Sequence, residues 1–196
     1  MKTHITKTVS NCFAVLRQIR SVRRSVTRPV LLSLIISLVL SRLDYGNATL
    51  AGLPQQSLSR LQSALNAAAR LVYAARKYEH VTPLLRDLHW LRIAERIDFK
   101  LSVLCFRCLY DMAPPYLADN LHRVADIEAR RRLQSASIAM LVVPRTRLST
   151  IGDRAFPVAA PRTWNNLPQH VISLSSLPTF KRHLKTVLFS RSFPDS

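Results

Sequence analysis

Glycine, acidic residues and cysteine are all scarce in this chain. Only 3 of its 196 residues are glycine, against 11 prolines, and no glycine-rich loop that could cradle a phosphate group is present. The sequence also lacks a G-x-S-x-G nucleophile elbow and an H-E-x-x-H zinc motif. Its three cysteines, an odd number without a secretory signal, favour a reducing compartment. We therefore expect an intracellular protein, nuclear or cytoplasmic rather than secreted, that does not belong to those enzyme classes.

The shortage of acidic residues leaves a large positive charge. The chain has 29 Lys and Arg against 11 Asp and Glu, a net charge of +18. The excess is uneven: residues 1–78 hold 12 basic and 1 acidic residue, residues 79–128 hold 6 and 8, and residues 129–196 hold 11 and 2. A polyanion such as nucleic acid is the natural partner of such a field. An anionic membrane surface is the alternative partner.

Hydrophobic periodicity predicts helices over most of the chain. Residues 4–19 form an amphipathic pattern, and residues 53–78 carry an apolar stripe at three- and four-residue spacing. The apolar run 29–40 has 12 residues, short of the roughly 20 that cross a bilayer, so it predicts a buried helix with Thr27 as its N-cap. We expect further helices after Thr82 and over 175–189.

We predict a mainly α fold, a helical bundle of about six to eight helices. The one β element expected is a small hairpin near 138–151, because that stretch is rich in β-branched residues and alternates in polarity. Charge divides the chain into a basic helical region 1–78, a helical core 79–128, and a basic region 129–196 with short strands and a final helix.

We find no catalytic constellation, cofactor site or metal site in the sequence. Two-metal phosphoryl transfer needs clustered carboxylates, whereas most acidic residues here stand beside basic ones. Cys105 and Cys108 have the C-x-x-C spacing of zinc and redox sites, but no second close pair of ligands exists, and both lie on the apolar stripe of a predicted helix. We interpret them, and Cys12, as core residues.

The remaining candidates are basic residues that suit phosphate recognition, since the planar guanidinium donates paired hydrogen bonds to phosphate oxygens. Phe156 and Trp164 could stack on bases, but their apolar surroundings favour core packing that holds nearby arginines in place. The predicted nucleic-acid contacts are Arg17, Arg20, Arg23, Arg24, Arg130, Arg131, Arg132, Arg145, Arg147, Arg154 and Arg162.

Four stretches carry a resemblance to a known family: "SRLDYGNATLAGLP", the run from "LQSALNAAARLVYAARKYEHVTPLL" to "CFRCLYDMAPPYLADNL", "LVVPRTRLSTIGDRAFPVAAPRTWNNLP" and "LPTFKRHLKTVLF". From about His4 to Phe189 the chain resembles the C-terminal third of the reverse transcriptase of non-LTR (LINE-type, CR1 and jockey-like) retrotransposons. Relatives often have cysteine at the position of Gly46.

The resemblance implies a thumb and post-thumb region that holds RNA or DNA by its backbone. The family's polymerase carboxylates have no counterpart here, so the resemblance implies a truncated, non-catalytic fragment that binds nucleic acid without sequence preference and takes no small-molecule substrate. Three alternatives stay open: a helical protein-interaction module, a membrane-surface module, and a decayed element product without a selected function. The sequence leaves the oligomeric state unassigned.

Overall fold

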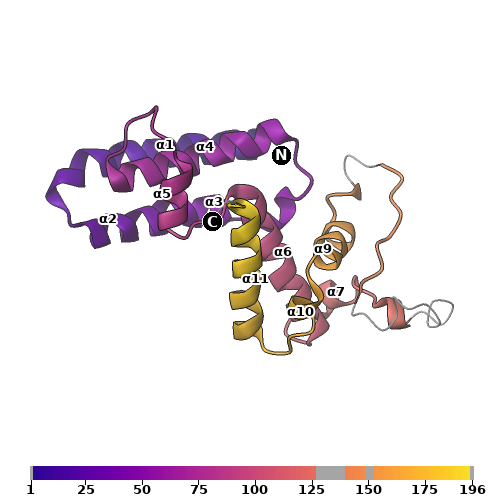
Figure 1. Cartoon of the computed structure of the whole chain (residues 1–196). Coiled ribbons are helices and arrows are strands. Elements are labelled where there is room, and N and C mark those ends of the chain that lie inside the picture. The colour runs from indigo at the N-terminus through magenta and orange to yellow at the C-terminus, as the bar shows by residue number, and fades with distance from the viewer. Residues whose placement is uncertain (1, 127–139, 149–151, 195–196) are drawn as a thin grey trace. The chain divides into compact units, whose positions relative to one another are not determined.

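The computed structural model describes residues 2–126, 140–148 and 152–194 (Figure 1). The mainly helical class is confirmed. The α-helices are α1 (Lys2–Val22), α2 (Arg28–Ile35), α3 (Ser41–Asp44), α4 (Gln55–Tyr73), α5 (Thr82–Asp87), α6 (Ile93–Leu109), α7 (Pro115–Ala118), α9 (Phe156–Asn165), α10 (Gln169–Ile172) and α11 (Leu177–Ser192). Short 3₁₀ turns are η1 (Arg23–Ser25), η3 (Asn47–Leu50) and η4 (Val124–Asp126), and η2 (Ile36–Leu40) is a π-helical turn.

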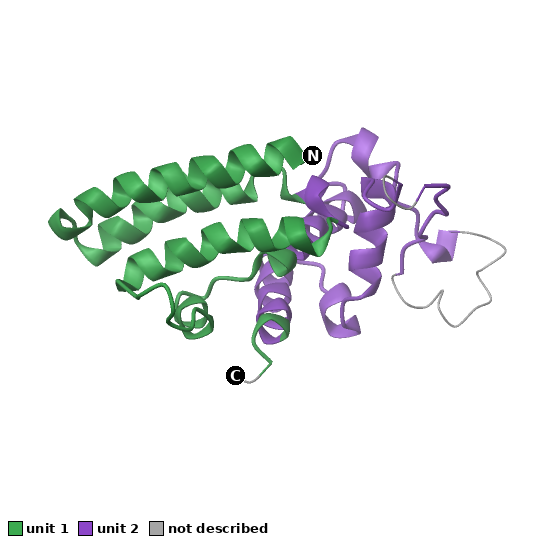
Figure 2. Cartoon of the chain, turned by 90° about the horizontal axis from the view of Figure 1, so that it is seen from above, with its two compact units in different colours: residues 1–47, 53–96, 191–196 green, residues 48–52, 97–190 purple. Residues whose placement is uncertain are grey.

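The chain divides into two compact units, coloured separately in Figure 2. Unit 1 comprises residues 1–47, 53–96 and 191–196, and unit 2 comprises residues 48–52 and 97–190. Helices α6 and α11 each begin in one unit and end in the other. The three-part division by charge at residues 78 and 128 describes composition and stays a prediction about organisation.

Unit 1 is built on the packing of α1 against α4. The buried side chains of α1 recur every three or four residues, at Ile5, Val9, Cys12, Leu16 and Ile19. On α4 they include Leu61, Leu65 and Val72, as the predicted stripe requires. Figures 1 and 2 show α1 and α4 running in the same direction, with α2 and α3 returning antiparallel beside them. Both helices therefore end at the same end of unit 1.

The helix that was predicted over 29–40 exists but is only half buried. It begins after Thr27, continues from α2 through η2 into α3, and buries Leu31, Ile35 and Val39. Its other face exposes 48% of Val30 and 40% of Leu38. Among the residues that the structure describes, no helix combines the length and apolarity needed to cross a membrane.

An aromatic cluster forms the core of unit 2. The ring of Phe106 on α6 stacks on Phe180 of α11 with centroids 4.6 Å apart, and Trp164 of α9 lies 5.6 Å from Phe180. All three side chains are buried. Such ring stacking adds to the free energy gained by burying the rings. The cluster joins three helices that are far apart in the sequence.

The predicted hairpin near 138–151 is not supported. Within the described residues 140–148, only Leu141 forms a β-bridge, and its partner is Arg123. The side chain of Asn165 accepts from the N–H of Leu141 at 2.9 Å and donates to its carbonyl at 2.8 Å. These partners satisfy the backbone groups of Leu141, so β propensity does not produce a hairpin within residues 140–148. The rest of the prediction, residues 138, 139 and 149–151, lies outside the described residues.

A partly buried ion pair joins distant segments of unit 1. Arg96 on α6 donates from Nε to Asp44 Oδ1 at 2.8 Å and from Nη2 to Oδ2 at 2.6 Å. The side chain of Asn47 also donates to Asp44, at 3.0 Å. The two charged side chains are 15% and 25% exposed, so solvent screens the pair only in part.

Replacing Asp44 with Asn should lower the free energy of unfolding by about 1–3 kcal/mol, because the guanidinium of Arg96 loses its charged partner in a desolvated place. Urea unfolding followed by circular dichroism measures the change. The matched control is Asp119→Asn, which alters an exposed carboxylate and should change stability by less than about 0.5 kcal/mol. Equal stability of the two variants would show that the ion pair does not hold α3 to α6.

Candidate nucleic-acid interface

Unit 1 has a strong excess of positive charge. It holds 16 Lys and Arg against 5 Asp and Glu, and the first 43 residues of the chain contain no carboxylate side chain at all. None of the residues of helix α1 is Asp or Glu. Cations that lack internal partners must stay hydrated at the surface, because a buried unpaired charge is strongly unfavourable.

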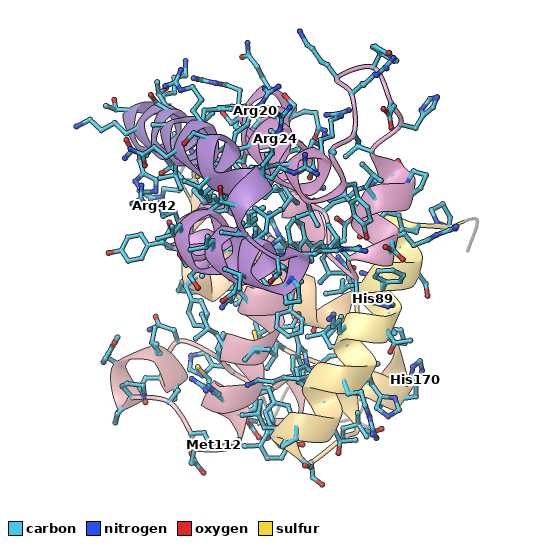
Figure 3. All side chains as sticks on the ribbon, turned by 90° about the vertical axis from the view of Figure 1, so that its left-hand side faces the viewer. Arg20, Arg24, Arg42, His89, Met112 and His170 are labelled. Atoms are coloured by element: carbon cyan, nitrogen blue, oxygen red, sulfur yellow. The ribbon has the colours of Figure 1, made fainter. Side chains whose placement is uncertain are left out.

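The amphipathic pattern of α1 directs its arginines outward. Arg17 and Arg20 are exposed positions of α1 outside the buried stripe, with Arg20 at its border, and Arg24 follows in η1. All three are exposed, and no ion pair within the described part of the chain engages them. Figure 3 looks toward the end of unit 1 where α1 leads into α2, and the labelled Arg20 and Arg24 lie there. Arg23 is half buried.

A cluster of contacts fixes the end of α4 beside the start of α2. The guanidinium of Arg28 lies 4.7 Å from the ring centroid of Tyr73, the last residue of α4. It also pairs with Asp87 of α5 at 3.7 Å, and the Tyr73 hydroxyl hydrogen-bonds the same carboxylate. We call this end of unit 1, with residues 17–28 and 73–81, the turn end.

The turn end brings further cations to the predicted ones. Arg76 and Lys77, in the loop between α4 and α5, are both exposed. They follow Arg24 by about fifty residues in the chain, so helical periodicity could not place them beside the α1 arginines. The sequence places Arg76 and Lys77 at the end of the predicted helix 53–78. It does not show that α1 and α4 run in the same direction, and this is the fact that brings the two helix ends to one end of unit 1.

The predicted arginines of unit 2 differ in what they contact. Arg145 and Arg147 are exposed. Arg162 donates to the carboxylate of Asp153 at 3.1 Å, which neutralises part of its charge. Arg154 is half buried, with its side chain against Gly52, where an added Cβ would lie 3.1 Å from Arg154 Cγ. Two of these four arginines therefore remain without an ion pair and open to solvent within the described residues.

Arg130, Arg131 and Arg132 lie outside the described residues. Of the two aromatics in the same predicted group, Trp164 is 1% exposed and belongs to the core, as the core interpretation predicted. Phe156, the first residue of α9, is half buried. Trp164 therefore has no face open to a base.

The cysteines are core residues, as predicted. Cys12, Cys105 and Cys108 are free and buried, and desolvation by burial raises the pKa of all three thiols. Within the described ranges, no group of three or more His, Cys, Asp or Glu side chains has the geometry to hold a metal ion. The C-x-x-C spacing here reflects two positions on one buried helix face.

Comparisons with known proteins give no relative: no protein-family model, no curated protein and no solved structure matches this chain. The interface is therefore defined by its own residues and charges.

The buried thiols predict slow labelling. In the folded protein, all three cysteines should react far more slowly with a disulfide reagent such as Ellman's than in guanidinium chloride, because burial hinders access and disfavours the reactive thiolate. Absorbance at pH 8 measures both rates. Rapid labelling of one thiol under native conditions would contradict its core role.

The Asp153–Arg162 contact predicts a titration shift. Hydrogen bonds from Arg162 and from Thr146 hold the pKa of Asp153 below its usual 3.8. The stabilisation from this carboxylate is therefore fully present above pH 3.8 and is lost as the pH falls through the folded-state pKa. Arg162→Gln should raise that pKa, measured by carbon-13 NMR titration, whereas Arg147→Gln should leave it in place. An unchanged Asp153 titration in Arg162→Gln would show that the contact does not form in solution.

Proposed function

We propose that this chain binds the sugar-phosphate backbone of RNA or DNA without sequence preference, and that the turn end of unit 1 is the main contact surface. The proposal assigns no catalytic step to the chain. It rests on backbone contacts, which supply affinity by releasing condensed counterions and carry no sequence information.

One observation carries the proposal: α1 and α4 end at the same end of a unit that has few carboxylates, and exposed cations lie in the last turns of α1, in η1 and in the loop after α4. Arg17, Arg20 and Arg24 supply guanidinium groups, which form paired hydrogen bonds to phosphate oxygens. Arg76 and Lys77 extend the same surface. The nearby carboxylate of Asp87 is already engaged by Arg28 and Tyr73, so it opposes a bound phosphate less than a free carboxylate would.

The resemblance to the thumb and post-thumb region of non-LTR retrotransposon reverse transcriptases supports the same proposal. That region is expected to hold template, primer or target strands by their backbones while another domain performs the polymerisation. We propose that unit 1 corresponds to the thumb-like part. Arg17 and Arg20 are carried by α1, whose helical backbone loses little further conformational entropy on binding.

A second candidate partner is an anionic membrane surface. It is favoured by the exposed apolar side chains of Val30, Ile36 and Leu38, on a helix segment flanked by Arg28 and Arg42. Amphipathic helices of this kind can lie in the plane of a lipid interface. Flotation with phosphatidylserine vesicles separates the two candidates, because binding to vesicles in the presence of excess RNA would favour the lipid.

Salt titration of wild-type and variant proteins tests the nucleic-acid proposal. Fluorescence anisotropy with a labelled 20-nucleotide RNA should show affinity falling steeply between about 50 and 200 mM salt, with a log–log slope of about 0.7 per phosphate contacted. The variant Arg17→Gln, Arg20→Gln, Arg24→Gln should bind about tenfold or more weakly and lower the slope by about two.

The matched control removes the same charge from the opposite end of the same unit. Lys2, Lys7 and Arg60 are exposed and lie near the starts of α1 and α4. Their joint replacement by Gln should weaken binding by less than about threefold, because only a long-range screened attraction is lost. Equal losses in the two triple variants would mean that net charge, and no particular surface, governs binding. Wild-type affinity that is independent of salt would overturn the proposal.

A further inference from the structure

The loop between α4 and α5 is an ordered turn. Helix α4 is capped after Tyr73 by Ala74, which adopts a left-handed conformation with φ of 57°. Within the loop the N–H of Arg76 donates to Glu79 Oε1 at 2.7 Å, and the N–H of Glu79 donates to the Arg76 carbonyl at 3.2 Å. Arg70 of α4 also donates to the carbonyl of Glu79, at 3.2 Å. These bonds hold residues 76–79 in one conformation.

This turn holds an aromatic ring in solvent. Tyr78 at its tip is 75% exposed, although a tyrosine ring gains free energy when it is buried. Its hydroxyl accepts a 2.6 Å hydrogen bond from Arg76 Nη1, and the Arg76 guanidinium lies 6.0 Å from the ring centroid. Its neighbours in the chain are the exposed Lys77 and Glu79, and the Glu79 carboxylate accepts from the N–H of Arg76. The ring is therefore oriented by the Arg76 guanidinium, and Arg76 and Lys77 supply cations beside it.

The position of Tyr78 matters as much as its exposure. The contact between Arg28 and Tyr73 fixes the root of this loop at the turn end, where Arg20 and Arg24 also lie. Tyr45 is equally exposed, at 75%, but it follows α3 at the opposite end of the helices of unit 1. Of these two tyrosines, only Tyr78 belongs to the loop that starts at the turn end, five residues after Tyr73.

We propose that Tyr78 stacks on an unpaired base, so that the turn end prefers single-stranded RNA or DNA over duplex. This inference rests on the proposed function and names its substrate class. Aromatic rings bind single strands by stacking on the face that any base offers, while cations follow the backbone. In a duplex the bases are already stacked on one another and offer no face to an external ring. The hydrogen-bonded turn limits the entropy that the loop loses on binding.

The test compares removal of the Tyr78 ring with removal of the Tyr45 ring, using a single-stranded and a duplex RNA probe. Labelled 15-nucleotide oligo(U) and a 15-base-pair RNA duplex are titrated with wild type, Tyr78→Ala, Tyr78→Phe and Tyr45→Ala. We expect Tyr78→Ala to bind oligo(U) about fivefold or more weakly while its duplex affinity changes less than twofold. Tyr78→Phe keeps the stacking face and should retain most of the affinity. Tyr45→Ala should match wild type on both probes.

The outcomes separate the two proposals. Salt-dependent binding by wild type, with Tyr78→Ala unchanged or weakened equally on both probes, overturns the stacking inference alone. An equal loss in Tyr45→Ala also overturns it, because any exposed ring would then suffice. Wild type that binds neither probe overturns the proposed function together with the inference. Circular dichroism of each variant verifies that these exposed substitutions leave the helices intact.

Discussion

The imbalance between cations and carboxylates is the constraint on which unit 1 depends. With 16 basic and 5 acidic side chains, most guanidinium and ammonium groups cannot find an internal partner. They must therefore remain in water, and the core can be built only from the apolar stripes of α1, α2 and α4. Because α1 and α4 run in parallel, their C-terminal turns meet, and cations near both of those turns collect at one end. The C-termini of α1 and α4 carry partial negative charges from their unpaired carbonyl groups, and these charges favour cations at this end of unit 1.

Three aspartates form ion pairs between segments that are separated in the sequence. Asp44 fastens α3 to α6 through Arg96, Asp87 fastens α5 to the start of α2 through Arg28, and Asp153 contacts Arg162 in unit 2. Glu79 shapes the loop that carries Tyr78. Each of these acids is engaged in structure, so the arginines of α1 face solvent without a competing acid on their own helix.

Periodicity was enough to predict α4 and α11, because their buried residues repeat at the helical interval. Periodicity predicted that the helix over 29–40 is buried, but only the face with Leu31 and Ile35 is buried. A continuous apolar run does not show which face of the helix packs against a neighbour. The hairpin prediction is not supported within residues 140–148, where the side chain of Asn165, distant in sequence, binds both backbone groups of Leu141. No element was predicted over 152–168, where α9 contains the internal Pro161, which normally argues against a helix. The turn end as a surface depends on contacts between residues 28, 73 and 87, which no local pattern encodes.

NMR spectra of the arginine Nε–Hε groups, recorded during titration with a single-stranded oligonucleotide, test this localisation most directly. We expect the signals of Arg17, Arg20, Arg24 and Arg76 to shift in a saturable manner, while the signal of Arg60 near the start of α4 stays in place. Shifts spread evenly over all arginines, or confined to groups outside the turn end, would contradict a defined surface for the sugar-phosphate backbone.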